Sequence, residues 1–526
     1  MNTVGKRVAQ HHFRFRLIGL VAILAIGVTG ALRRYLWTDD TVDGGNLGKL
    51  ARAVGDHRLT RARLSGGFAY ARCQIDSSAD RLVRGLVCDG PAPTSWKSAG
   101  RLRTLASDMR GQSDSTSRGA HTAGVWDLIW GRTDDAVADL REAVKREPPN
   151  ARTLNDLAVA LTESAERHDD PSALVDAFVA ADSAVRIDST LKEARFTHAL
   201  LLEQLYLRAD AIDAWNRYLK LDGKSRWADE ARERLASLQP KAYNLKQNEE
   251  RLRRAVAASD ATTIRSIVAD NPSDVRMVMA SELGHWGAMF GGGDSARALA
   301  HLQFARAIAG PLQAVTGDAL VVDAVRVIDQ ALAERDTTRA RALAQGHAAL
   351  AKGIELFNGR GPRKAIAELL NARRLLATGA SPMAAWAQLY SARAQILILP
   401  DTALAWLTAI RDSTPSRYPT LRSVAAQYKG YLYDLRADHM HMIAAYDSAV
   451  SENQNTREPG VALRAGSWLA QAEDALRGRK AAWRTRYATL AATPRYPLSY
   501  RENYTVFDYA GTATANDAPR LSLRYC

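Results

Sequence analysis

The sequence has little of what many enzymes and metalloproteins require. It contains only three cysteines among 526 residues. Cys73 and Cys88 belong to no CxxC pair and have no paired histidine nearby, and Cys526 is the last residue, so a structural zinc site lacks ligands. The sequence also contains no HExxH, GxSxG, Walker or dinucleotide-binding fingerprint. These absences predict a non-enzymatic protein with no cofactor, no bound metal and no small-molecule substrate.

Two local patterns resemble ligand sites without predicting one. His439-Met440-His441-Met442 offers imidazole and thioether groups of the kind that bind copper. On a helix, however, neighbouring positions point in different directions, so the two imidazoles do not converge. The GGGDS run at 291–295 is not followed by Gly-Lys-Ser/Thr, as a phosphate-binding loop requires. We interpret this run, and NPSD at 271–274, as breaks between helices.

Blocks of one charge are also missing. The net charge is +14, from 71 Lys and Arg against 57 Asp and Glu, a balance that suggests nucleic acid as a partner. Yet the basic residues alternate with acidic ones, as in DLREAVKRE and DEARERLASL. This mixture is typical of solvated helix faces, so we expect no nucleic-acid partner.

One long uncharged apolar run is present, LIGLVAILAIGVTGAL, from Leu17 to Leu32. As a helix it reaches about 24 Å, slightly short of a bilayer core, and the arginines that follow it can extend toward the interface. We therefore predict a basic segment over 1–16 and a transmembrane anchor over 17–37. A cleaved signal peptide is the alternative.

The charges around this run predict its orientation. Four basic residues precede it and two follow it, which favours a cytoplasmic N-terminus. In a bacterium the anchor then lies in the inner membrane and the remaining chain in the periplasm. There Cys73 and Cys88 are able to form a disulfide. Two free thiols are the other state that the sequence allows.

The most informative pattern is a spacing that recurs five times. Each set begins with a small residue. A second residue follows twelve positions after it, a bulky residue follows four positions after the second, and a last residue follows three positions after the bulky one. Small residues let two antiparallel helices approach closely, and the bulky residue shares a helical face with the position four before it. The five sets are Gly124, Ala136, Leu140 and Ala143; Ala199, Ala211, Trp215 and Tyr218; Gly353, Ala365, Leu369 and Ala372; Ser391, Ala403, Leu407 and Ile410; and Gly430, Met442, Tyr446 and Ala449.

This spacing resembles the tetratricopeptide repeat, a helix–turn–helix unit of about 34 residues. The resemblance implies an all-α solenoid of antiparallel helix pairs, following the transmembrane helix, with a groove that binds a protein or peptide. An unrelated all-α protein with Ala-rich helices is the alternative. We predict a linker and irregular region over 38–118, arrays over 119–240 and 344–492, a helical connector over 241–343 and an irregular tail over 493–526.

In such repeats the first helix of each pair lines the concave face, which gives candidate peptide-binding residues. Asn can bond to a peptide backbone and Arg can hold a carboxylate. The alternative is that these are ordinary surface residues. The candidates are Arg152, Asn155, Thr162, Phe196, Leu200 and Gln204.

Residues 58–73, 151–205 and 214–222 together resemble the repeat half of membrane-anchored bacterial CHAT-domain proteins. In that family a caspase-like cysteine protease domain follows the repeats. We find no Gln-Ala-Cys-x-Gly site here, so the resemblance transfers no catalytic residue. The sequence therefore predicts a membrane-anchored scaffold or sensor. The alternative is the recognition half of a CHAT-type protease system whose catalytic domain is lost or on a separate chain.

Overall fold

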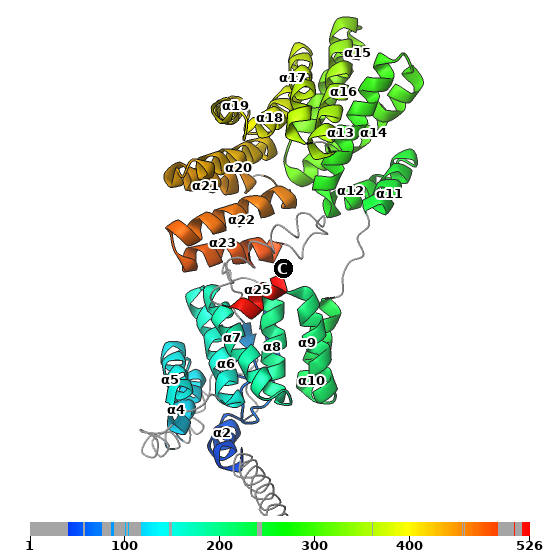
Figure 1. Ribbon diagram of the computed structural model, residues 1–526. Coiled ribbons are helices and arrows are strands. Elements are labelled where there is room, and N and C mark those ends of the chain that lie inside the picture. The colour runs from blue at the N-terminus through cyan, green and yellow to red at the C-terminus, as the bar shows by residue number, and fades with distance from the viewer. Residues whose placement is uncertain are drawn as a thin grey trace, which may run out of the picture.

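The computed structural model describes residues 40–55, 58–75, 86–88, 100, 104, 117–146, 150–238, 245–359, 361–454, 456, 458–492, 510 and 518–525. Within these residues nearly all regular structure is helical, and the one sheet is a two-stranded pair. Consecutive helices pack against each other along most of the chain (Figure 1). The prediction of an all-α helical-repeat fold is confirmed.

We call helices α4 to α10 the first array. In it, α6 packs against both of its sequence neighbours and also against α4 and α8, so the first helices of successive pairs form one continuous layer. The helices are α4 (Ser117–Ile129), α5 (Thr133–Arg146), α6 (Ala151–His168), α7 (Ser172–Ile187), α8 (Lys192–Gln204), α9 (Arg208–Leu221) and α10 (Arg226–Ser237).

The remaining helices continue the pattern of packed neighbours. Proline occupies the first turn of α13, α17, α19, α20 and α22, where its missing N–H costs no helical hydrogen bond. They are α11 (Leu245–Ala257), α12 (Ala261–Asp270), α13 (Pro272–Gly291), α14 (Ser295–Thr316), α15 (Leu320–Ala333), α16 (Thr337–Gly359), α17 (Pro362–Thr378), α18 (Met383–Gln395), α19 (Pro400–Ser413), α20 (Pro419–Leu435), α21 (His439–Asn453), α22 (Pro459–Leu476) and α23 (Arg479–Ala492).

The small residues of the repeat spacing lie where helices touch. A Cβ atom added at Gly124 would lie 2.5 Å from Cγ of Leu140, and one at Gly430 would lie 2.4 Å from Cε1 of Tyr446. Both bulky residues come from the same unit as the glycine that they face. Close approach of the paired helices is therefore the physical origin of the spacing.

The predicted connector follows a different packing rule. Helix α13 packs closely against α16, although α14 and α15 lie between them in the sequence. Here too the approach needs glycine, because a Cβ at Gly287 would lie 2.0 Å from the carbonyl oxygen of Ala344. This non-sequential pairing explains why residues 241–343 lack the regular repeat spacing.

The last helices return to the first array. Trp483 and Tyr487 of α23 belong to the same buried apolar cluster as α6 to α9. Helix α25 (Pro519–Tyr525) also lies against α7 (Figure 1), and the Tyr525 hydroxyl donates to the carbonyl of Leu205 at 3.0 Å. Ion pairs from Arg520 and Arg524 to first-array aspartates surround this contact. The C-terminal end therefore extends the first array's core.

The range predicted as linker contains ordered elements. Helix α2 (Asp40–Val54) is followed by an extended stretch and by strands β1 (Cys73–Ile75) and β2 (Leu86–Cys88), which pair antiparallel. Their register places Cys73 opposite Cys88. Residues opposite each other in such a pair have Cα atoms about 4.5–5.5 Å apart, within the range of a disulfide. The backbone is compatible with the disulfide, which stays a prediction.

The predicted membrane anchor over 17–37 lies outside the described residues. Among the described residues, no helix combines the length and the apolar character that crossing a membrane requires. The anchor and its orientation therefore stay predictions.

Candidate functional site

The chain's own residues 58–71, which we call the groove segment, run across the first helices of the first array without helix or strand, with a bend at 61–62 and a turn at 65–67. The segment contacts α6 and α8 near its middle and α10 near its start. The turn at 65–67 needs glycine, because Gly66 has φ +100° and a Cβ there would lie 2.6 Å from Cβ of Leu47 in α2. A polypeptide segment without helix or strand thus occupies the face that the repeat register assigns to a ligand.

The array recognises the backbone of the segment. The Asn155 side-chain amide donates to the carbonyl of Arg63 at 2.9 Å, and the Thr197 hydroxyl approaches the same oxygen at 3.4 Å. The N–H of Ser65 donates to Oδ1 of Asp156 at 2.8 Å. His121 contacts the other oxygen of this buried carboxylate, also at 2.8 Å. Such main-chain bonds hold a bound chain regardless of most of its side chains.

The array also holds three arginines of the segment through separate carboxylates. Arg58 pairs with Glu230 of α10, and Arg61 pairs with Glu166 of α6 at 2.9 Å. Arg63 donates to Asp222, just after α9, at 2.8 Å and to the Tyr218 hydroxyl at 2.8 Å. Charge-assisted bonds of this kind select arginine at defined positions of a bound chain.

Arg58 enters deepest. Its side chain is only 1% exposed, and its guanidinium lies 4.3 Å from the ring centre of Trp227 and 5.4 Å from that of Tyr70. It also donates to backbone carbonyls within the segment, including that of Thr60 at 3.0 Å. Burial lowers the pKa of Arg58, although the Glu230 carboxylate opposes this effect. The aromatic faces and Glu230 together replace the water that a guanidinium loses.

Apolar residues of the segment fill the space between these charges. Ala62, Leu64 and Phe68 are buried and belong to the apolar cluster of the first array. The segment is therefore bound by apolar burial, by main-chain hydrogen bonds and by ion pairs at once.

One carboxyl of the groove is shifted strongly. Burial and the neighbouring Glu166 charge raise the pKa of Glu163 to about 8, although the backbone N–H of Arg61 donates to it at 2.9 Å. At neutral pH this side chain is mostly protonated in the folded protein. Its role is to accept from the segment's backbone rather than to supply a negative charge.

The six residues proposed from the repeat register have different places. Asn155 reaches the segment as its amide chemistry suggested, and Arg152 offers its backbone carbonyl to Ser65 Oγ at 3.5 Å. Phe196 lies 6.0 Å from the Arg58 guanidinium and packs edge-on against Trp227. The others point elsewhere: Thr162 donates within its own helix, Leu200 is a fully buried core residue, and Gln204 is buried at the end of α8.

The carboxylates were missed by sequence reasoning. Asp156 and Glu163 each follow a proposed residue of α6 by one position, and Glu166 lies four positions after Thr162, on the face that the register assigned to the groove. The matching signal in the segment is RLTRAR, with arginine at positions 58, 61 and 63. An acidic inner helix and a basic segment of the same chain are complementary, and comparing the two could have revealed the contact.

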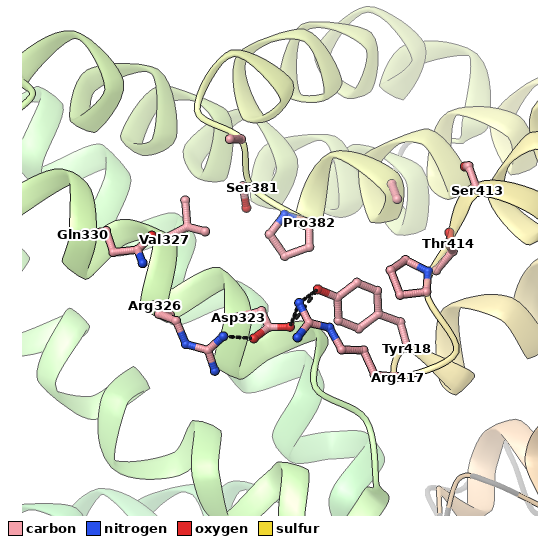
Figure 2. A pocket seen from close by; sticks show the side chains of 13 residues that line it. Asp323, Arg326, Val327, Gln330, Ser381, Pro382, Ser413, Thr414, Arg417 and Tyr418 are labelled. Atoms are coloured by element: carbon pink, nitrogen blue, oxygen red, sulfur yellow. Dashed lines mark hydrogen bonds and ion pairs between the residues drawn. The ribbon is translucent and has the colours of Figure 1, made fainter.

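A second concavity lies among the helices after the first array. It is a pocket of about 440 Å³ lined from α15 and from the turns before α18 and α20. Figure 2 shows that its charged side chains are turned toward Asp323, which accepts from Tyr418 at 2.7 Å and pairs with Arg326 and Arg417. Both guanidinium groups of this pocket are already paired with Asp323, whereas the carboxylates of the groove pair with a polypeptide segment. The groove is therefore the stronger candidate for a peptide-binding site.

Comparisons with known proteins give no family. No protein-family model matches the chain, and no curated protein does. Three similar solved structures are the P58(IPK) TPR domain, yeast Tom70 and a chain of the APC/C hetero-tetramer Cut9-Hcn1. Their identities are 14%, 12% and 11%, and their TM-scores are 0.23, 0.28 and 0.23. The matches cover 69%, 77% and 81% of this chain and 98%, 90% and 89% of theirs, respectively.

Proposed function

We propose that this protein is a tetratricopeptide-type scaffold whose first array binds a non-helical, arginine-containing polypeptide. The observation that carries this proposal is the groove segment itself, because its backbone and three of its arginines are bonded to residues of the first array. The occupant in this structure belongs to the same chain. A partner with arginines at the same spacing would compete for the same carboxylates.

Occupation by the chain's own segment has a functional consequence. The segment directly follows α2, which in turn follows the predicted anchor at 17–37. If that anchor lies in a bacterial inner membrane, the groove holds the array close to the membrane surface on the periplasmic side. A tethered segment acts at an effective concentration on the order of millimolar, so a partner must bind tightly or the segment must be weakened.

The proposed activity is binding without catalysis. The groove's charged side chains are used in ion pairs with the segment, which is typical of recognition. The CHAT-type alternative gains no support from the comparisons and stays a prediction.

The test uses a fluorescent peptide with the sequence of residues 57–72. We expect weak binding to the wild-type protein, whose groove is filled, and tight binding to a full-length R58A/R61A/R63A variant. The same peptide with its three arginines changed to alanine is the matched control and should not bind. Addition of the unmodified peptide should also restore the variant's thermal stability. If neither protein binds the peptide and no stability is restored, the groove is not a polypeptide-binding site.

A further inference from the structure

We propose that Glu282, His285 and His301 form a binding site for a borderline divalent transition-metal ion such as Zn²⁺. The site lies in the helices after the first array and shares no residue with the groove. It is also distinct from the His-Met run at the start of α21. Nothing in the proposed scaffold function requires it, so it stands or fails separately.

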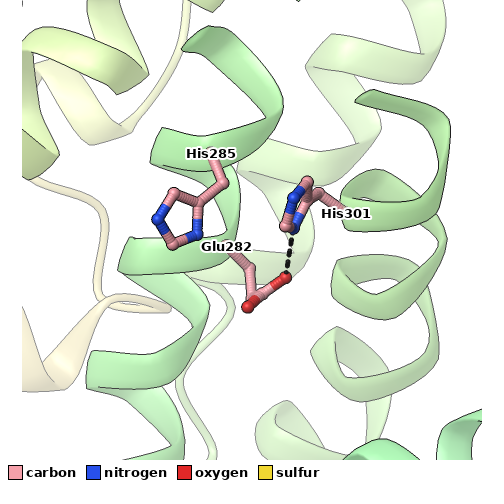
Figure 3. Close-up of side chains that lie close together, drawn as sticks. All are labelled: Glu282, His285 and His301. Atoms are coloured by element: carbon pink, nitrogen blue, oxygen red, sulfur yellow. Dashed lines mark hydrogen bonds and ion pairs between the residues drawn. The ribbon is translucent and has the colours of Figure 1, made fainter. Parts of the chain in front are cut away.

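The three side chains converge from two helices. Glu282 and His285 are three positions apart on α13, and therefore share one face, while His301 projects from α14 toward them (Figure 3). One potential ligand atom from each residue lies within 4.8 Å of those of the other two. Nδ1 of His301 lies 2.8 Å from Oε2 of Glu282, and the imidazole rings are 5.2 Å apart between centres.

Small side-chain movements would complete the coordination. With metal–ligand bonds of about 2.0–2.2 Å, two ligands on a tetrahedral ion are about 3.4 Å apart. The separation of 2.8 Å between His301 and Glu282 is shorter than this value, and the other ligand atoms lie within 4.8 Å of one another. His285 is exposed, and none of the described residues forms a hydrogen bond or ion pair with it, so its ring is able to turn toward the site. His301 is half-buried and Glu282 is buried, which gives the site a fixed side and an adjustable side.

The surroundings of Glu282 resemble the outer shell of a metal site. Its side chain is 1% exposed, and its Oε1 accepts from Arg253 Nη2 at 2.6 Å. Arg253 is fixed in turn by Glu249 at 2.9 Å and by the ring of Phe304 at 5.1 Å. An outer-shell donor on one carboxylate oxygen orients the other toward the metal. Here that other oxygen, Oε2, faces the imidazoles.

The donor set determines which ion fits. Two imidazoles and one carboxylate suit zinc, copper, nickel or iron better than magnesium or calcium, which prefer oxygen ligands. Three protein ligands leave a coordination position open to water or to a group from another molecule. Because Arg253 belongs to α11, a bound ion would connect α11, α13 and α14.

The test is the binding of Zn²⁺ alone to tag-free, metal-stripped full-length protein, measured by titration calorimetry and by metal analysis after dialysis. We expect one ion per chain. H285A and E282Q should each weaken binding by about tenfold or more. H439A/H441A, which removes two exposed histidines outside the site, should leave binding unchanged. Co²⁺ should give visible absorption bands that H285A removes.

Two results would overturn the proposal. One is no binding of Zn²⁺ by the wild-type protein at micromolar concentrations. The other is wild-type binding that persists undiminished in H285A and E282Q, whether or not H439A/H441A loses it. H285A changes an exposed side chain, so its helical content by circular dichroism should match the wild type, which separates lost binding from lost folding.

Discussion

Replacing Arg63 with alanine should weaken the first array at one defined place. In the folded protein Arg63 donates to Asp222 and Tyr218, each at 2.8 Å, and its guanidinium lies 5.2 Å from the ring centre of Trp227. The Asp222 side chain is only 7% exposed. The substitution removes its cation and leaves the carboxylate with two weaker, uncharged donors.

The size of the loss follows from the pKa of Asp222. Burial alone raises this pKa, but hydrogen bonds from Arg63, Ser225 and Tyr218 outweigh burial and bring it from 3.8 to about 2. That shift corresponds to about 2.4 kcal/mol shared among three donors. Arg63 therefore supplies about 1 kcal/mol here, and its contact with the indole ring adds about 0.5–1 kcal/mol. We expect R63A to lower the free energy of unfolding of the first array by about 2 kcal/mol.

The assay is hydrogen exchange with mass spectrometry along a urea series, following peptides from α8 to α10 in the full-length protein. R72A is the matched control, because Arg72 belongs to the neighbouring stretch and pairs with Glu233, but their side chains are 68% and 64% exposed. R72A should change the free energy of unfolding of the first array little. The difference between R63A and the wild type should also shrink as the pH falls from 3.8 toward 2, where Asp222 becomes protonated. Equal effects of R63A and R72A would refute the reasoning.

Three further outcomes are expected. In thermal unfolding, G430A should destabilise its helix pair by about 1–3 kcal/mol, because its new Cβ meets a ring of α21, whereas G310A, with nothing within 4 Å, should be neutral or stabilising. Wild-type stability should fall as the pH rises from 4.5 to about 8, since Glu163 keeps its proton only in the folded state, and E163Q should remove this slope in pH-dependent urea unfolding. Peptide mapping of protein made in an oxidising compartment should find Cys73 joined to Cys88, and two alkylatable thiols would contradict that disulfide.

The sequence predicted the repeats well because their cause is local. The distance between paired helices depends on the residues that touch, so Gly124 and Leu140 report their contact through spacing alone. The pairing of α13 with α16 was not predicted, because it joins helices that are not neighbours and needs only single glycines such as Gly287. This contact occurs once, so no recurring spacing in the sequence marks it.

The groove was predicted only in part for a similar reason. Repeat register indicates which helix face is concave, and it selected Asn155 correctly as a residue that reaches a backbone carbonyl. It does not indicate what fills the groove. Recognising that residues 58–71 bind there requires pairing Arg61 with Glu166 across 105 positions, and Arg58 with Glu230 across 172. The Glu282 cluster likewise joins separate turns of two helices.

The most direct test of the central claim is residue-resolved hydrogen exchange of the groove segment in the full-length wild-type protein. The claim is that the first array binds a non-helical polypeptide through its backbone. The N–H groups of Arg61 and Ser65, which donate to Glu163 and Asp156, should exchange far more slowly than that of exposed Gly67. N155A, which removes the bond to the Arg63 carbonyl, should speed exchange at Ser65. Exchange of all three amides at the rate of an unstructured chain would contradict the account.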